Sequence, residues 1–227
     1  MASNIFQLGF SQSQILGLVK DTRALREAFE AGSLPAVATK LQATLHSLEN
    51  VRLDIGITGG TGSGKSTFVN AIRGLGDEDP NSACTGVVEM TVEPTPYPHP
   101  KYPNIVIWDL PGIGAPTFQA EKYLQRVLVD RYDFFIIITS ESFTAKHAQL
   151  ARGIVQRSKG FYFVRSKVDV DMAASCCRRP STFSKEQVLS QIRDDCSQRL
   201  EGEVRLRRCW GGWVLEGLLA PSPSSSR

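Results

Sequence analysis

The chain has 227 residues and a formal net charge of +3 at neutral pH. Its 41% hydrophobic and 22% charged residues are ordinary for a folded globular protein, which excludes a disordered chain, a collagen-like chain and a disulfide scaffold. The net charge is too small to indicate a nucleic-acid partner. We therefore expect one domain of ordinary size with a small helical appendage and no nucleic-acid partner.

The cysteines and the hydropathy of the chain predict a reducing, non-membrane environment. The five cysteines form no Cys-x-x-Cys pair and follow no secretory signal pattern, which indicates free thiols. No run approaches the roughly 18 to 20 consecutive apolar residues of a spanning helix, and Ala2 in place of glycine excludes N-myristoylation. Any membrane contact is expected to be peripheral. Three histidines lack metal-ligand spacing and are expected on the surface: His46, His99 and His147.

Two helices are predicted at the start of the chain. Apolar residues recur at helical spacing between residues 12 and 31, and Gly32 follows as a typical stop. A second helix begins at Ser33, a good N-cap with Pro35 in the first turn. The pattern predicts a helical hairpin over residues 1–50 that packs on the main domain, and an interaction surface is the alternative interpretation.

From residue 51 to residue 200, short β-prone runs alternate with helical stretches. Strands are predicted at 51–58, 104–110, 132–139 and 161–166, and helices at 65–74, 118–130, 144–158 and 184–200. This alternation predicts an α/β three-layer sandwich around a parallel sheet. Residues 87–97 contain Pro94 and Pro96, which predicts an edge strand. No strand followed by a helix is predicted within residues 201–227, so we expect a divergent, partly disordered tail and a sheet that lacks its last strand.

The first strand leads into a phosphate-binding motif. Residues 59–67, GGTGSGKST, match G-x-x-x-x-G-K-[ST] between a predicted strand and a predicted helix. Glycines let the backbone N–H groups of such a loop surround a phosphate at a helix N-terminus. Lys65 is predicted to bind the β- and γ-phosphates and Ser66 to ligate Mg²⁺. The predicted nucleotide contacts of the motif are Gly59, Thr61, Gly62, Ser63, Gly64, Lys65, Ser66 and Thr67.

A second motif, WDLPG, ends the next parallel-type strand. Its Asp109 is predicted to reach Mg²⁺ through water, and the Gly112 N–H is predicted to sense the γ-phosphate and switch the following loop. Small GTPases have a water-orienting glutamine in the next position, where this chain has Ile113. Hydrolysis by the isolated monomer is therefore expected to be slow, with a polar group supplied from elsewhere in the chain or by a partner.

The loop between these motifs holds the candidates for a first switch. Thr85, Glu89 and Thr91 lie there, and either Thr85 or Thr91 is a candidate Mg²⁺ ligand when GTP is bound. For each of the three, an ordinary loop residue is an equally weighted alternative.

A third motif predicts the base. Ser166-Lys167-Val168-Asp169 follows a predicted strand and is a variant of the N/T-K-x-D element. The Asp169 carboxylate can accept hydrogen bonds from guanine N1–H and the 2-amine, whereas adenine has an acceptor at N1 and no 2-amine. Lys167 is expected to lie along the base. GTP or GDP with Mg²⁺ is the predicted ligand, and an ATP-dependent P-loop kinase is the disfavoured alternative.

Five segments together closely resemble the interferon-inducible immunity-related GTPases of the GKS type. They read GGTGSGKSTFVNAIRG, TGVVEMT, PYPHPKYPNIVIWDLPGIG, RYDFFIII and FYFVRSKVD. The resemblance covers about residues 15 to 200, and its PYPHP, WDLPG and YDFF runs are not shared by GTPases in general. It implies a Ras-like or dynamin-like G domain whose interface threonine and glutamate fall on Thr85 and Glu89, with Lys65, Glu89 and Gly112 in catalytic roles.

The resemblance also implies a biological setting. Members of the family bind GDP and GTP, assemble through their nucleotide faces as homo- or hetero-oligomers, hydrolyse GTP cooperatively and act in innate immunity. The implied location is cytoplasmic, with peripheral contact to the endoplasmic reticulum or other intracellular membranes. Family members continue into a last G-domain strand, a further base-contacting loop and a large C-terminal helical domain. We therefore expect weaker nucleotide affinity, and a truncated isoform that regulates full-length relatives is the alternative function.

Overall fold

The computed structural model describes residues 38–39, 42, 51–86, 91–114, 118–203 and 213–214. Residues 38, 39 and 42 are helical, and the rest of the predicted N-terminal hairpin lies outside the described residues.

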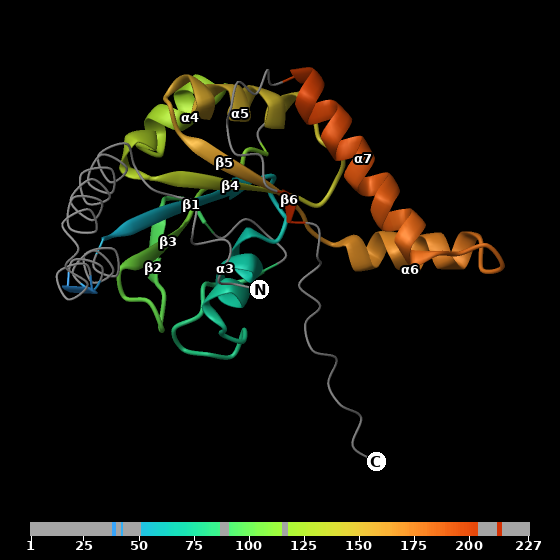
Figure 1. The fold of residues 1–227 in the computed structure, drawn as a ribbon, viewed down its shortest axis with the longest axis horizontal. Coiled ribbons are helices and arrows are strands. Elements are labelled where there is room, and N and C mark those ends of the chain that lie inside the picture. The colour runs from blue at the N-terminus through green and yellow to red at the C-terminus, as the bar shows by residue number, and fades with distance from the viewer. Residues whose placement is uncertain are drawn as a thin grey trace, which may run out of the picture.

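A six-stranded sheet forms the centre of the fold, in the order β2-β3-β1-β4-β5-β6 (Figure 1). β2 runs antiparallel to β3, and the other neighbouring strands are parallel. The predicted parallel sheet is thus confirmed, and the proline-containing strand lies at an edge, as expected. The strands are β1 Leu53–Gly59, β2 Thr95–Pro98, β3 Ile105–Asp109, β4 Phe134–Thr139, β5 Gly160–Arg165 and β6 Trp213–Val214.

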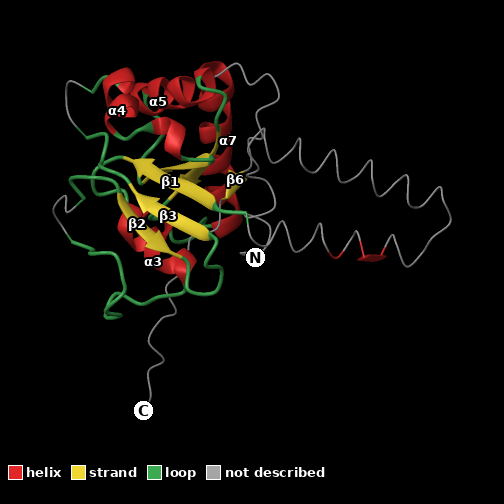
Figure 2. Ribbon diagram, turned by 90° about the vertical axis from the view of Figure 1, so that its left-hand side faces the viewer, coloured by secondary structure: helices red, strands yellow, loops and turns green. Residues whose placement is uncertain are grey.

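Helices cover both faces of the sheet, which confirms the three-layer sandwich. Figure 2 shows α3 on one side of the strands and α4 and α5 on the other. No helix in the described part of the chain is long and apolar enough to cross a membrane. The helices are α3 Lys65–Arg73, α4 Ala120–Arg126, α5 Ala145–Gln156, α6 Val168–Arg178 and α7 Lys185–Glu203, with a 3₁₀ turn at Val129–Arg131.

The continuous apolar run of β4 explains the two-sided core. Alternate side chains of a strand point to opposite faces, so a strand buried on both faces is apolar throughout. Phe135 and Ile137 pack in the cluster that contains residues of α4, α5 and α7. Phe134 and Ile136 pack in the opposite cluster, with Val69 of α3.

The structure differs from the sequence-based expectation at two places. Helix α6 was not predicted, because its sequence has no clear apolar stripe. In the structure, Val168 is the one buried residue of this helix. We also expected no strand after residue 200, but β6 pairs in parallel with β5 through Phe163–Trp213 and Val164–Val214. The sheet therefore has a two-residue strand at this edge.

The fold brings the predicted motifs to one edge of the sheet. The phosphate motif follows β1, the Asp109 motif ends β3, and the Ser166–Asp169 segment follows β5. Because β1, β3 and β5 run in the same direction, their carboxyl ends lie at the same edge. Ligands of open α/β sheets bind in the crevice outside this edge.

Candidate nucleotide-binding site

The loop from β1 to α3 has the backbone shape of a phosphate-binding loop. Gly59 has φ +143°, and a Cβ there would meet the Ile138 carbonyl oxygen at 1.9 Å, so the loop passes β4 too closely for a side chain. Gly64, at the N-cap of α3, has φ +86°, which favours glycine. The loop therefore ends at a helix N-terminus, where backbone N–H groups and the helix dipole favour an anion.

Lys65 is the first residue of α3 and is only 7% exposed. Its Nζ donates to the Gly60 carbonyl oxygen at 3.1 Å. The ammonium group is thus held across the loop. Ser63, also predicted as a contact, is 1% exposed, and its Oγ has no hydrogen-bond partner among the described residues.

Three oxygen-bearing side chains meet beside the loop. Asp109 is 1% exposed, and its Oδ2 accepts hydrogen bonds from Ser66 Oγ at 2.6 Å and Thr91 Oγ1 at 2.9 Å. In the described part of the structure, Asp109 Oδ1 has no hydrogen-bond partner. Burial raises the pKa of Asp109, opposed by the two hydroxyl hydrogen bonds and by the charge of Lys65.

This arrangement fits Mg²⁺. The ion prefers oxygen ligands and takes one or two carboxylates, and a bound cation would satisfy the unpartnered Asp109 oxygen. Of the two candidate threonines, Thr91 reaches Asp109, and Thr85 lines the neighbouring cavity. Glu89 lies outside the described residues.

A cavity of about 150 Å³ opens over the loop. Its wall contains residues of the phosphate motif, residues of the predicted first switch segment and Lys167 of the third motif. The predicted residues Asp109, Gly112 and Asp169 are not part of this wall. The lining residues are Thr61, Gly62, Gly64, Lys65, Ser66, Thr67, Cys84, Thr85, Gly86, Thr91 and Lys167.

The Asp109–Ile113 loop lies against the phosphate loop. Leu110 N donates to Ile57 O, and Ile113 N donates to Gly59 O, each at 3.0 Å. The Ile113 side chain is 3% exposed and belongs to the hydrophobic core. This position therefore contributes a core contact and no group that could orient water.

The third motif is tied to the phosphate loop through Ser166. Its Oγ lies 2.6 Å from Ser63 O and 3.0 Å from Thr139 O, although the two serines are 103 residues apart. Ser166 thus joins the phosphate loop to the end of β4. Lys167 has φ +55° at the N-cap of α6, and Asp169 is exposed in the first turn of that helix.

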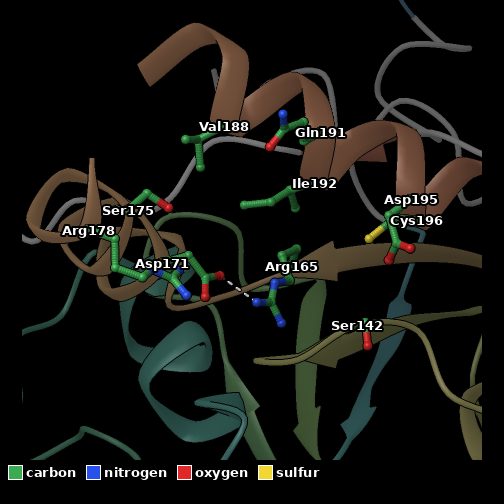
Figure 3. A pocket seen from close by; sticks show the side chains of 10 residues that line it. All are labelled: Ser142, Arg165, Asp171, Ser175, Arg178, Val188, Gln191, Ile192, Asp195 and Cys196. Atoms are coloured by element: carbon green, nitrogen blue, oxygen red, sulfur yellow. Dashed lines mark hydrogen bonds and ion pairs between the residues drawn. The ribbon is translucent and has the colours of Figure 1, made fainter. Parts of the chain in front are cut away.

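An ion pair that sequence reasoning missed supports this first turn. Arg165 ends β5, and its Nη2 donates to Asp171 Oδ2, two residues beyond Asp169 (Figure 3). The Arg165 side chain is 9% exposed, at the wall of a second cavity of about 270 Å³ between α6 and α7. Aspartates in the first turn of a helix are a typical helix-start signal, and Asp169 and Asp171 were the available clue to α6.

The expectation of surface histidines is wrong for two of them. His99 and His147 are each 5% exposed, and burial lowers the pKa of both. Both rings make hydrogen bonds to the backbone: His99 Nε2 lies 3.1 Å from Ile72 O, and His147 Nδ1 accepts from Thr144 N. The described residues contain no cluster of three or more His, Cys, Asp or Glu side chains that could hold a metal.

Comparison with known proteins gives relatives that extend well beyond this chain. Interferon-inducible GTPase 5 of Bos taurus is 48% identical over 194 residues, which cover 86% of this chain and 42% of the relative. T-cell-specific guanine nucleotide triphosphate-binding protein 2 of Mus musculus is 44% identical over 181 residues, covering 80% and 44%. The chain thus spans about two fifths of the length of these curated relatives.

The fold and the family are both shown. LeoA, a bacterial dynamin GTPase from ETEC, matches 87% of this chain and 35% of its own with a TM-score of 0.54 at 17% identity, which shows a dynamin-like G-domain fold. The model of the interferon-inducible GTPase (IIGP) family matches residues 18–209. Because this match covers most of the chain, the chain belongs to the interferon-inducible GTPase family.

Proposed function

We propose that this chain binds GTP and GDP with Mg²⁺ and hydrolyses GTP slowly. The observation that carries the proposal is the convergence of Ser66 and Thr91 on the buried Asp109 carboxylate, beside Lys65. A buried carboxylate with two hydroxyl partners and one unpartnered oxygen is costly in an apolar core, and a divalent cation would stabilise it.

Each residue of the site has a proposed role. The backbone N–H groups of residues 60–65 surround the β-phosphate, and Lys65 neutralises the β- and γ-phosphates. Ser66, Thr91 and Asp109 hold Mg²⁺, directly or through water, and the ion when bound neutralises charge on the phosphate oxygens. The N–H of Gly112 faces the γ-phosphate.

The guanine base is assigned to the segment after β5. Asp169 accepts hydrogen bonds from the base, and Lys167 lies along its face. This assignment is supported by the position of Asp169 and Lys167 at the start of α6. Ser166, which precedes them, is hydrogen-bonded to Ser63 of the phosphate loop. Arg165 and Asp171 hold the same turn.

Slow turnover follows from the position of Ile113. Its side chain packs in the core, so the group that orients the attacking water comes from another residue or another molecule. We propose association through the nucleotide face, as homo-oligomers or with family relatives, with Thr85 and Glu89 at the contact. Hydrolysis per molecule is then expected to rise with protein concentration, whereas association without turnover favours the alternative of a regulatory binding module.

The primary test is a titration with a fluorescent GDP analogue and Mg²⁺, competed by GTP, GDP and ATP. We expect competition by both guanine nucleotides and not by ATP. Lys65→Ala and Asp169→Asn are expected to weaken binding at least tenfold, since each removes a charged contact. Lys122→Ala on α4 and Asp130→Asn before β4 are matched controls, because both side chains are exposed and outside the site. Competition by ATP equal to that by GTP would contradict the proposal.

From family membership we further propose a role in interferon-induced innate immunity. The proposed location is cytoplasmic, with peripheral attachment to the endoplasmic reticulum or another intracellular membrane. Fractionation of interferon-treated cells with alkaline carbonate extraction tests this: a peripheral protein is released, and a protein retained in the membrane pellet would contradict the proposal.

A further inference from the structure

A buried tyrosine on α4 is hydrogen-bonded to the Asp109–Ile113 loop. Tyr123 is 8% exposed, and its hydroxyl donates to the Pro111 carbonyl oxygen at 2.8 Å. The same hydroxyl lies 2.7 Å from Thr58 Oγ1. Since the single phenolic proton is directed to Pro111, Thr58 acts as the donor to Tyr123. Burial raises the pKa of Tyr123 far above its usual range, so this proton stays in place at any physiological pH.

These two hydrogen bonds form a relay, Thr58–Tyr123–Pro111, that joins two parts of the proposed nucleotide site. Thr58 is the residue before Gly59, at the start of the phosphate loop, and Pro111 lies between Asp109 and Gly112. Proline has no N–H, so its carbonyl oxygen is the one backbone group of residue 111 that a hydrogen bond can hold. The flanking residues are held separately, Leu110 by Ile57 and Ile113 by Gly59.

The geometry of one peptide unit gives this contact a functional consequence. The Pro111 carbonyl and the Gly112 N–H belong to the same planar unit, and the described chain contains no cis peptide bond. In a trans unit the C=O and the N–H point in opposite directions. Holding the carbonyl at Tyr123 therefore directs the Gly112 N–H away from α4. Glycine at 112 imposes little conformational preference of its own, so contacts of the neighbouring backbone, the Tyr123 hydrogen bond among them, select this orientation.

We infer that Tyr123 and Thr58 are positioning residues that orient the Gly112 N–H for the γ-phosphate and so distinguish GTP from GDP. The inference rests on the proposed function, in which Gly112 senses that phosphate. GDP has no γ-phosphate, so its binding does not depend on this N–H. A purely structural role for the two hydroxyls would affect both nucleotides equally.

The test compares two nucleotides in four variants. The affinities of Mg·GDP and of a Mg-bound nonhydrolysable GTP analogue are measured for Tyr123→Phe, Thr58→Val, the double variant and Tyr132→Phe. Tyr132 is the matched control: it is buried in the same core cluster, and within the described residues its hydroxyl makes no hydrogen bond to the Asp109–Ile113 loop. Urea unfolding of each variant establishes that it is folded.

We expect Tyr123→Phe to lower the affinity for the GTP analogue by about three- to tenfold, the range that the loss of one hydrogen bond gives. The affinity for GDP should change less than twofold. Thr58→Val is expected to act in the same direction, and the double variant to lose little more, because both hydroxyls belong to one relay. Tyr132→Phe is expected to leave both affinities within twofold. In single-turnover hydrolysis, the rate of Tyr123→Phe falls even at saturating GTP.

The outcomes separate this inference from the proposed function. Equal weakening of both nucleotides, or no change in either, overturns the positioning role while wild-type binding still supports the proposed function. Absence of nucleotide binding by folded wild-type protein overturns both. If Tyr123→Phe does not fold, Thr58→Val alone decides between the same outcomes.

Discussion

Asn70, in the middle of helix α3, holds the loop that leads to the cavity over the β1–α3 loop. Its Nδ2 donates to Ala83 O at 3.0 Å, and its Oδ1 accepts from Ala83 N at 2.6 Å. Both residues are buried, and Cys84 and Thr85 of the cavity wall follow directly. One side chain thus satisfies both backbone groups of Ala83, which would otherwise be buried without partners.

Asn70→Ala is expected to lower the free energy of unfolding by about 2–4 kcal/mol, because a buried N–H and a buried C=O each lose their partner. Urea denaturation measures this change. Asn81→Ala is the control, since Asn81 is exposed and its side chain makes no hydrogen bond among the described residues, and it should change stability by less than about 0.5 kcal/mol. Equal losses in the two variants would contradict the role of the Ala83 contact.

Asp109, the proposed Mg²⁺-site residue, combines unfavourable and favourable contributions to stability. Burial of its carboxylate is unfavourable, while the hydrogen bonds from Ser66 and Thr91 are favourable. Asparagine keeps acceptor capacity and removes the charge.

We therefore expect Asp109→Asn to leave the stability of the nucleotide-free protein within about 1 kcal/mol of wild type, because the two effects oppose each other. The same substitution is expected to abolish the increase in GTP affinity that Mg²⁺ produces. Urea unfolding and GTP titrations with Mg²⁺ or with EDTA measure the two effects. A variant that keeps the full Mg²⁺ dependence would rule out Asp109 as part of the metal site.

Among the elements, α5 is expected to have a pH-sensitive N-terminus. Thr144 and His147 form a capping box, in which His147 Nδ1 accepts from the Thr144 backbone N–H at 3.1 Å. Burial lowers the pKa of His147 to about 4. The neutral ring is therefore the folded form, and protonation at Nδ1 would remove the acceptor of the capping box.

Because the folded pKa lies below the unfolded value of about 6.5, the contribution of His147 is complete above pH 6.5 and is lost as the pH falls toward 4. We expect a loss of up to about 3 kcal/mol across this range. Chemical denaturation at pH 7, 6 and 5 measures it. His147→Gln keeps a capping-box acceptor and does not titrate, so its stability should fall less over the same range. Parallel curves for the two proteins would exclude His147, because the buried His99 is present in both.

Helix α6 is an element that tertiary contacts define more than its own sequence does. It carries Asp169 in its first turn and buries only Val168, while α7 packs beside it. The Arg165–Asp171 ion pair joins its first turn to β5. The orientation of Asp169, the proposed base-binding residue, therefore depends on contacts of α6 with β5 and α7 that a local pattern does not identify.

At the scale of the whole molecule, nucleotide binding and folding are expected to be linked. A ligand that binds the folded chain alone at 100 times its dissociation constant stabilises that chain by about 2.7 kcal/mol. For a domain of this size, this corresponds to a rise of roughly 5–10 °C in melting temperature.

We expect such a rise with saturating GDP and Mg²⁺ and none with ATP at the same concentration. GTP with Mg²⁺ should also raise the melting temperature, and EDTA should reduce that rise, since Ser66, Thr91 and Asp109 then lack the metal. Differential scanning fluorimetry measures the melting temperature under each of these conditions. Lys65→Ala should show no rise with any nucleotide. An equal rise in that variant would place binding outside the proposed site.

The sequence by itself determined the class of fold and the position of the phosphate loop. Alternating apolar runs and helical stretches predict a parallel sheet. The glycine-rich motif, Lys65 and Ser66 lie in one contiguous segment, so the place of the candidate phosphate-binding loop follows from neighbouring residues. The position of Asp109 at the carboxyl end of a buried strand could likewise be predicted from the sequence. These features depend on residues that are neighbours in the chain.

The tertiary structure alone decided the contacts between distant segments. Thr58 and Tyr123 are 65 residues apart, and Ser63 and Ser166 are 103 apart, so no local pattern indicates that they meet. The packed fold also decided that Thr91 and not Thr85 donates to Asp109, and that Ile113 is buried. The physical reason is that a local pattern records the periodicity of backbone structure, whereas hydrogen-bond partners and burial are fixed when the layers pack together.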